Sequence, residues 1–297
     1  MLVVFGSVAL DTIRTPTKTL RCQFGGAATF ASISASFFTK TGLLAVVGSD
    51  FPKKYSNVLA KRINLSGLNI KKGKTFHYDG RYDKTLQNRT TLKTELNVLD
   101  GFKATVPDKY KRSKFVYLAN NDPEQNIRVL GEFEKVKFSM CDTIDFWIHT
   151  KRAAVKKMIA IVDAVVINDE EARLLVKEHN LVRCAKKISK MGAKYVIIKK
   201  AEHGALFFYE DTVFASPGFP IPDPVDPTGA GDSFAGAIIG YMANANSSSP
   251  ATIKKAITYG NVMGSIVVQG YGTAPLLRLK KATIEKRAAK YHSIVCS

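Results

Sequence analysis

The chain alternates short apolar runs with longer segments in which apolar residues recur at helical spacing. Continuous apolar runs are typical of strands buried on both faces, and they occupy residues 2–5, 43–47, 115–118, 136–140, 164–167 and 195–198. Segments with the spacing of amphipathic helices lie between them, at residues 27–38, 55–63, 123–133, 152–161, 170–178 and 182–191. This alternation predicts an α/β fold, a doubly wound and mostly parallel sheet flanked by helices.

Two stretches interrupt this alternation. Residues 11–24 and 73–101 are rich in Thr, Tyr and Arg and lack helical periodicity. They predict short strands that leave the α/β body and pair into one small β-sheet. Lying across the strand ends, where open α/β sheets bind their ligands, this sheet would be a lid that excludes water. The alternative is a pair of hairpins with no such role.

The last third of the chain has a different pattern. A hairpin is predicted at 205–208 and 212–214, then a Pro-rich turn at 217–227 and helices at 230–243, 250–268 and 283–293. At 297 residues, we expect a single domain over 1–297, with the lid as a subdomain formed by about 11–24 and 73–101.

The chain is strongly basic, with 44 Lys and Arg against 25 Asp and Glu and a formal net charge of +19. The lysines occur as scattered pairs and only 12 of the basic residues are arginine, which favours a solvated surface over a nucleic-acid interface. A positive field would still attract anionic ligands such as nucleotides.

No apolar window is long enough to span a membrane, and no basic segment precedes the first strand. We therefore expect a cytoplasmic protein with no membrane partner. Cys22, Cys141, Cys184 and Cys296 lie far apart without a CxxC pair, which predicts reduced thiols. The five histidines lack the spacing of metal ligands.

The segment DPTGAGDSFAG at residues 226–236 carries the most chemical information. A Pro turn leads through two glycines into a long helix, whose first amides and dipole favour an anion such as phosphate. Asp232 falls in the first helical turn. It is either a helix-stabilising acid or a base that accepts a hydroxyl proton while the amides neutralise a transferring phosphoryl group.

Two other nucleotide motifs do not fit. The glycines at 229, 231 and 236 imitate a dinucleotide fingerprint, but that motif should follow the first strand and open a βαβ unit. A GxxxxGK[ST] sequence is also absent from the chain, which excludes a P-loop enzyme.

Six segments together resemble, in the same order, the ribokinase/PfkB carbohydrate kinase family. They are GSVALD at 6–11, GGAA at 25–28, VGSDF at 47–51, NDEE at 168–171, residues 199–204 and the segment 226–236. The resemblance covers nearly the whole chain and implies a ribokinase-like fold. It also implies a kinase that uses ATP and Mg²⁺.

The resemblance assigns roles to particular residues. It implies that Asp232 is the catalytic base, that Gly229, Ala230 and Gly231 form the anion hole, and that Asp11, Gly25 and Gly26 bind the acceptor. It places Asn168, Glu171, Lys199, Gly204, Thr228 and Asn261 at the nucleotide. Asn168 and Glu171 would organise Mg²⁺ through water, although their spacing also fits an N-cap with a capping-box acid. Asp226 and Thr228 match positions beside a monovalent cation, such as K⁺.

Three positions depart from the family pattern. Ala9 and Phe30 stand where free-sugar kinases often carry amides, and an apolar or aromatic lining suits a nucleobase. This favours a nucleoside acceptor, unless Phe30 faces the core of its helix. Ala201 replaces the usual glycine of the ATP turn, and the sequence does not decide whether the turn tolerates it.

The sequence thus predicts transfer of the γ-phosphoryl group of Mg·ATP to a primary hydroxyl of a ribose-type sugar or nucleoside. The nucleoside is favoured. The alternatives are a free-sugar kinase for ribose, fructose or inositol, and a relative that binds sugar or nucleotide without turnover. A homodimer through the lid is a further expectation, because exposed strand edges invite pairing.

Overall fold

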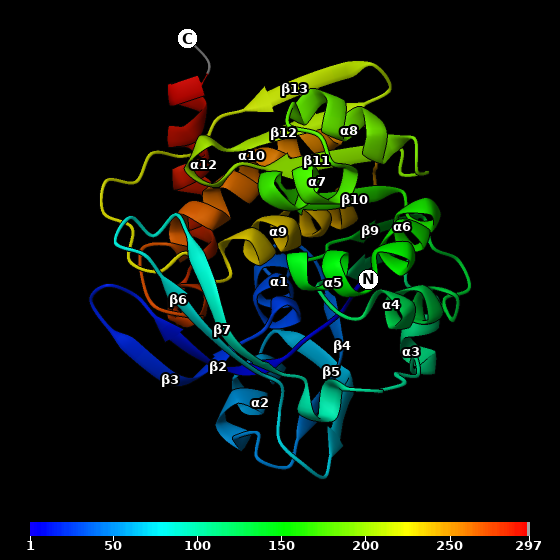
Figure 1. Ribbon diagram of the computed structural model, residues 1–297, viewed down its shortest axis with the longest axis vertical. Coiled ribbons are helices and arrows are strands. Elements are labelled where there is room, and N and C mark those ends of the chain that lie inside the picture. Colours follow the sequence, from blue (N-terminus) through cyan, green and yellow to red (C-terminus); the bar gives the residue numbers. More distant parts are fainter. Residues whose placement is uncertain (296–297) are drawn as a thin grey trace.

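The computed structural model describes residues 1–295, and within them a nine-stranded sheet forms the middle layer of the molecule (Figure 1). Neighbouring strands pair in parallel from β5 to β11, and β12 and β13 add two antiparallel pairs at the edge next to β11. In order across the sheet they are β13 (Thr212–Ser216), β12 (Ala205–Tyr209), β11 (Tyr195–Lys199), β10 (Ala164–Asn168), β9 (Phe138–Cys141), β8 (Phe115–Leu118), β1 (Leu2–Phe5), β4 (Thr41–Gly48) and β5 (Ile63–Lys71).

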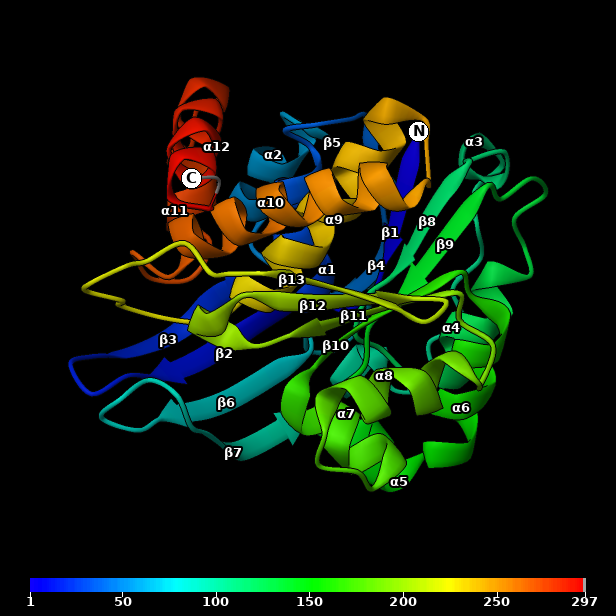
Figure 2. The same ribbon diagram turned by 90° about the horizontal axis from the view of Figure 1, so that it is seen from above.

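Helices cover both faces of this sheet, and Figure 2 shows the two helical layers on either side of the strands. One face packs against α1 (Ala27–Ala35), α2 (Lys53–Ala60), α9 (Ala230–Ala245), α10 (Pro250–Val267), α11 (Ala274–Arg278) and α12 (Lys281–Val295). The other packs against α3 (Asp108–Lys111), α4 (Pro123–Leu130), α5 (Asp145–Thr150), α6 (Arg152–Ile161), α7 (Asp169–Val176) and α8 (Leu181–Ser189).

Strand β1 shows why the strands are uniformly apolar. Leu2 and Val4 join the hydrophobic cluster on one face of the sheet, whereas Val3 and Phe5 join the cluster on the other. Side chains alternate between the faces of a strand, so a strand covered on both sides must be apolar at every position. The predicted doubly wound, mostly parallel sheet is confirmed.

The two interrupting stretches pair into a separate small sheet, as predicted. It contains β3 (Thr19–Gly25), β2 (Ala9–Arg14), β6 (His77–Tyr82) and β7 (Arg89–Glu95), in that order. Two antiparallel hairpins are joined by the parallel pair β2 and β6. We call this the lid sheet. It projects to one side of the large sheet in both views (Figures 1 and 2).

Several boundaries differ from those predicted. The helix expected at 55–63 ends at Ala60, and β5 follows it as an unpredicted edge strand. The second lid stretch, predicted over 73–101, leaves the lid sheet after Glu95, where β7 ends. Residues Asn97–Leu99 form a 3₁₀ turn (η1), and Leu99 is buried in the core of the α/β body. The short helices α3, α5 and α11 were not predicted.

Two expectations concern the chain as a whole. No helix within residues 1–295 is long and apolar enough to cross a membrane. Cys22, Cys141 and Cys184 are free thiols, as predicted, while Cys296 lies outside the described residues.

Candidate active site

Several of the residues singled out from the sequence lie at the carboxyl edge of the large sheet. Asn168 ends β10, and Lys199 ends the neighbouring strand β11, with the two residues in register. Asp142 directly follows β9. The N-terminus of α9 approaches the same edge, because a β-carbon on Gly231 would lie 3.4 Å from Nζ of Lys199. Parallel strands therefore bring these distant segments together.

The turn predicted to bind an anion, residues 226–231, depends on a glycine for its shape; we call it the anion-binding turn. Gly229 is the N-cap of α9 with a φ of 77°, and a β-carbon there would lie 2.3 Å from the ring of Phe30. Only glycine satisfies both the backbone and the space. The amide of Ala230 donates to the carbonyl of Pro227 at 3.1 Å, so this amide closes the turn.

The side chain of Asp226 stabilises this turn through hydrogen bonds to backbone amides. Its side chain is fully buried and accepts hydrogen bonds from the amides of Thr228 at 2.9 Å and Gly272 at 3.0 Å. These bonds join the Pro-rich turn to the segment after α10. The carboxylate thus has a clear structural role, and its place beside a monovalent cation stays a prediction.

Asp232 lies in the first turn of α9 and is half-buried. Burial raises the pKa of Asp232 to about 6, and the charge of Asp142 adds to the rise. The cations Lys199 and Arg89 oppose it. A pKa near neutrality suits a group that must take a proton and later release it.

Asp11 lies in β2 at the opposite end of the candidate site and is 5% exposed. Its carboxylate accepts the amide of Tyr78 at 3.2 Å. A β-carbon on Gly25 would lie 2.3 Å from Oδ2 of Asp11, while Gly26 is the N-cap of α1. Burial raises the pKa of Asp11 to about 8, and the charge of Asp232 adds to this.

Asn168 and Glu171 form a capping box at the start of α7. The amide of Glu171 donates to Oδ1 of Asn168 at 2.7 Å, and the amide of Asn168 donates to Oε2 of Glu171 at 3.0 Å. The alternative interpretation of this pair is thus confirmed as a structural role. Asn168 and Glu171 also lie at the carboxyl edge of the sheet, so their capping role is compatible with the expected role in organising Mg²⁺ through water.

Magnesium fits this edge only as an ion that keeps its water shell. Residues 1–295 contain no group of three or more His, Cys, Asp or Glu side chains arranged to hold a metal directly. Burial raises the pKa of Glu171 to about 8. The charge of Lys199 lowers this pKa, and the charge of Asp142 raises it. A hydrated Mg²⁺ placed here would favour the charged forms of Glu171 and Asp232, whose pKa values burial raises.

The expected nucleotide turn begins as a 3₁₀ turn over Ala201–His203 (η2). Ala201 adopts a φ of 48°, the left-handed conformation that glycine adopts more easily. Gly204 packs so closely against the segment 216–218 that a β-carbon would lie 2.1 Å from the carbonyl of Ser216. Asn261 is buried, and its amide nitrogen donates to the Ser216 hydroxyl and the Pro217 carbonyl, each at 2.9 Å.

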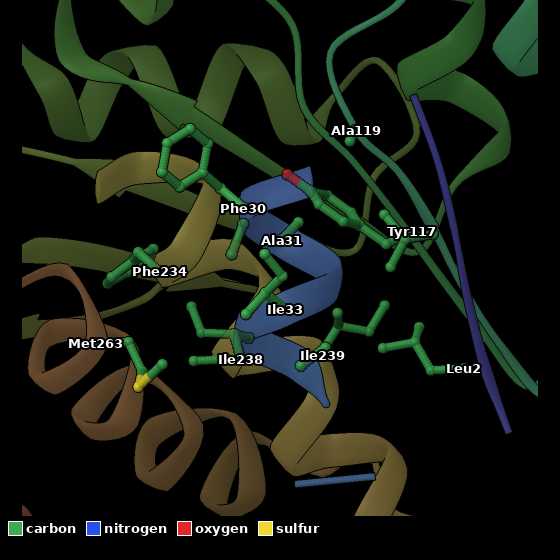
Figure 3. Close-up of a cluster of buried hydrophobic side chains, with 14 of the residues drawn as sticks. Leu2, Phe30, Ala31, Ile33, Tyr117, Ala119, Phe234, Ile238, Ile239 and Met263 are labelled. Carbon is green, nitrogen blue, oxygen red and sulfur yellow. The ribbon is translucent and has the colours of Figure 1, made fainter. Parts of the chain in front are cut away.

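The expectation that Phe30 lines the acceptor site is wrong. Its side chain is 2% exposed and belongs to the hydrophobic core (Figure 3), and Ala9 is fully buried. Every residue of α1 is buried, so Phe30 packs inward and supports Gly229 from behind. The alternative that Phe30 faces the core is the one that the structure supports.

The lid sheet contacts both the anion-binding turn and the nucleotide turn. The Thr228 hydroxyl donates to the hydroxyl of Tyr82 on β6 at 3.3 Å, and Gln87 donates to Glu202 at 3.0 Å. A third contact joins the hydroxyls of Thr17 and Tyr271 at 3.0 Å. These contacts hold the lid sheet against the body of the protein beside both turns.

Sequence reasoning missed three residues of this site. Asp142 was detectable in principle, because it follows a predicted parallel strand at the edge where ligands bind. Tyr82 and Arg89 come from the lid sheet, and the guanidinium carbon of Arg89 lies 5.3 Å from the ring centroid of Tyr78. No local sequence signal marks these two residues, since only the pairing of β6 with β7 brings them over the site.

A doubly wound sheet with a polar carboxyl edge and a lid is the ribokinase-like architecture. The structure of Burkholderia thailandensis nucleoside kinase in complex with inosine superposes with a TM-score of 0.80, covering 99% of each chain at 17% identity. This likeness defines the fold class.

Sequence relatives extend the comparison. The chain is 29% identical over 252 residues to cytidine kinase of Thermococcus kodakarensis, covering 81% of this chain and 88% of that protein. It is 25% identical over 283 residues to nucleoside kinase of Methanothermobacter thermautotrophicus, covering 87% and 82%. The family described as pfkB family carbohydrate kinase matches residues 1–279. The chain belongs to this family.

Proposed function

We propose that this protein transfers the γ-phosphoryl group of Mg·ATP to the primary hydroxyl of a nucleoside. The observation that carries the proposal is the position of Asp232 in the first turn of α9, directly after the glycine turn. In the reaction, the acceptor hydroxyl gives its proton to Asp232 as its oxygen bonds to the γ-phosphorus atom, and the bond from that phosphorus to the bridging oxygen breaks to release ADP. The amides at the start of α9 would offset the charge that develops on the phosphoryl oxygens, and bound magnesium would add to this effect.

The two ends of the site divide the work. Asp11 would accept hydrogen bonds from the sugar hydroxyls, which orients the primary hydroxyl toward Asp232. At the other end, Asn168, Glu171, Lys199, Gly204, Thr228 and Asn261 would hold the Mg·ATP complex. Magnesium, when bound there, would supply positive charge that neutralises part of the charge of the phosphates.

The choice of a nucleoside no longer depends on Phe30. It is supported by the relatives, since both long sequence matches carry nucleoside acceptors in their names. The lid adds a second support. Tyr78 is half-buried, its amide donates to Asp11, and its ring lies under Arg89. An aromatic ring at the acceptor end offers a surface for a base.

We expect a nucleoside to be a better acceptor than a free sugar. Contact of the base with an aromatic ring contributes about 1–3 kcal/mol, or about 5- to 150-fold. The measurement is kcat/KM for cytidine, adenosine, inosine, ribose, fructose and inositol under the same conditions. A free sugar preferred by tenfold or more would assign the protein to the free-sugar kinases. Binding of any of these without ADP release would identify a relative without turnover.

The activity should also fall in acid. Asp232 accepts a proton only as a carboxylate, and burial raises the pKa of Asp232 to about 6. Below that value kcat/KM for the acceptor should drop about tenfold per pH unit, because the protonated fraction rises by that factor. A profile measured at saturating Mg·ATP from pH 4.5 to 8 tests this. Activity that stays constant down to pH 5 would contradict the assignment of Asp232.

A further inference from the structure

Asp142 lies at the carboxyl edge of the sheet, and the proposed function assigns it no role. It is 2% exposed. Its Oδ1 accepts the amide of Thr143 at 2.8 Å, while Oδ2 accepts Nζ of Lys199 at 2.7 Å and the hydroxyl of Tyr117 at 3.4 Å. Because these donors belong to rigid strands or their ends, the carboxylate is held in one orientation.

Lys199 reaches Asp142 across the intervening strand β10. Its side chain is 15% exposed, and its ammonium lies against the start of α9, since a β-carbon on Gly231 would be 3.4 Å from Nζ. A lysine side chain has four rotatable bonds and loses much rotamer freedom when it is fixed. The ion pair with Asp142 supplies the constraint that places the charge beside the anion-binding turn.

Stability alone is a poor explanation for this pair. Removing two charges from water costs several kcal/mol per ion, and replacing a buried ion pair with apolar residues is often neutral or stabilising. Burial alone would lower the pKa of Lys199, but the charges of Asp142 and Glu171 hold that pKa above its ordinary value. The ammonium therefore stays charged at the place where a phosphoryl group would be held.

We propose that Asp142 is a positioning residue that holds the Lys199 ammonium beside Gly231, where the ammonium contacts the γ-phosphoryl group of ATP. The proposal rests on the function proposed above. During transfer the bond from the γ-phosphorus to the bridging oxygen of ADP breaks, and a bond to the acceptor oxygen forms. The hydroxyl proton goes to Asp232, and Lys199 keeps its protons throughout and stabilises the phosphoryl oxygens.

A double-mutant cycle tests whether Asp142 acts through Lys199. Asp142→Asn should lower kcat about 10- to 100-fold in the wild-type background, because the ammonium loses its fixed position. In the Lys199→Met background the same substitution should change kcat less than about twofold, and KM for the acceptor should stay constant in all variants. An equal loss in both backgrounds would overturn the proposal. The double variant removes both charges, so the comparison survives if Asp142→Asn alone folds poorly.

Nucleotide binding gives a readout that is independent of turnover. In calorimetry, Asp142→Asn should weaken the Mg complex of the β,γ-imido analogue of ATP about tenfold and leave Mg·ADP within about twofold. Asp163→Asn is the matched control, because Asp163 also binds a strand residue, Ser139, at 2.7 and 2.8 Å but precedes β10 at the opposite edge. Equal weakening of both nucleotides would overturn the proposal.

The two proposals fail in different ways. If the wild-type protein binds the analogue but transfers no phosphoryl group, the proposed function is wrong, and the binding comparison still decides the role of Asp142. If the wild-type protein binds neither nucleotide, both proposals are overturned.

Discussion

Replacing Asp232 with asparagine should lower turnover by at least about 10²-fold, the usual contribution of a general base. Asparagine keeps the size and polarity of the side chain, so the start of α9 should stay intact and Mg·ATP should bind with near-normal affinity. The loss should therefore appear in kcat and only weakly in KM for ATP. Steady-state kinetics with nucleotide-binding calorimetry separates the two effects.

A matched control addresses the alternative that Asp232 only stabilises its helix. Asp108 is likewise an acid in the first turn of a helix, α3, where it pairs with Lys111 at 2.7 Å. Asp108→Asn should leave kcat unchanged, since any effect of a first-turn acid on the helix is below about 1 kcal/mol. Near-normal kcat in Asp232→Asn would remove this residue from the chemistry.

Replacing Asp11 with alanine should raise KM for the acceptor about 10- to 150-fold. Hydroxyl donors on the acceptor favour the charged form of Asp11 and so lower its raised pKa. Each hydrogen bond to the charged group then contributes roughly 1.5–3 kcal/mol, and 1.4 kcal/mol corresponds to about a factor of ten. Turnover at saturating acceptor should fall less than binding, because Asp232 and the turn at Gly229 are untouched. Acceptor and ATP titrations of the same preparation measure this.

The control for Asp11 lies in the same lid sheet. Asp79 pairs with Arg14 at 2.8 Å, so Asp79→Ala removes a carboxylate from the lid without removing the proposed acceptor contact. It should leave KM for the acceptor within about threefold, since partly exposed ion pairs contribute at most about 1 kcal/mol. If Asp11→Ala instead raised KM for ATP alone, the two ends of the site would be reversed.

The fold was predictable where the sequence pattern has one structural meaning. Fully apolar runs such as 115–118 became strands because only a strand covered on both faces buries every position. Strand β5 was missed because it lies at the sheet edge with much of its surface exposed. Its mixed pattern then resembles the end of a helix or a loop more than a strand.

The site was predictable where a local segment carries the chemistry. The start of α9 combines glycines, a turn and Asp232 within a few residues, so its arrangement follows from the sequence. Phe30 was harder, because α1 is buried on all sides and its periodicity gives no direction. Asp142 was missed because its partner Lys199 is 57 residues away, and only the order of the strands brings the two together.

The most direct test of the central claim is to follow the phosphoryl group itself. Purified protein, Mg·ATP labelled at the γ-phosphate and cytidine are incubated, and the products are analysed by mass spectrometry and ³¹P NMR. The account predicts one ADP for each nucleoside monophosphate, with the label in a phosphate ester on the primary hydroxyl, and a rate at least about 10²-fold lower for Asp232→Asn. Release of labelled inorganic phosphate alone, or no labelled ester with any nucleoside or sugar, would contradict it.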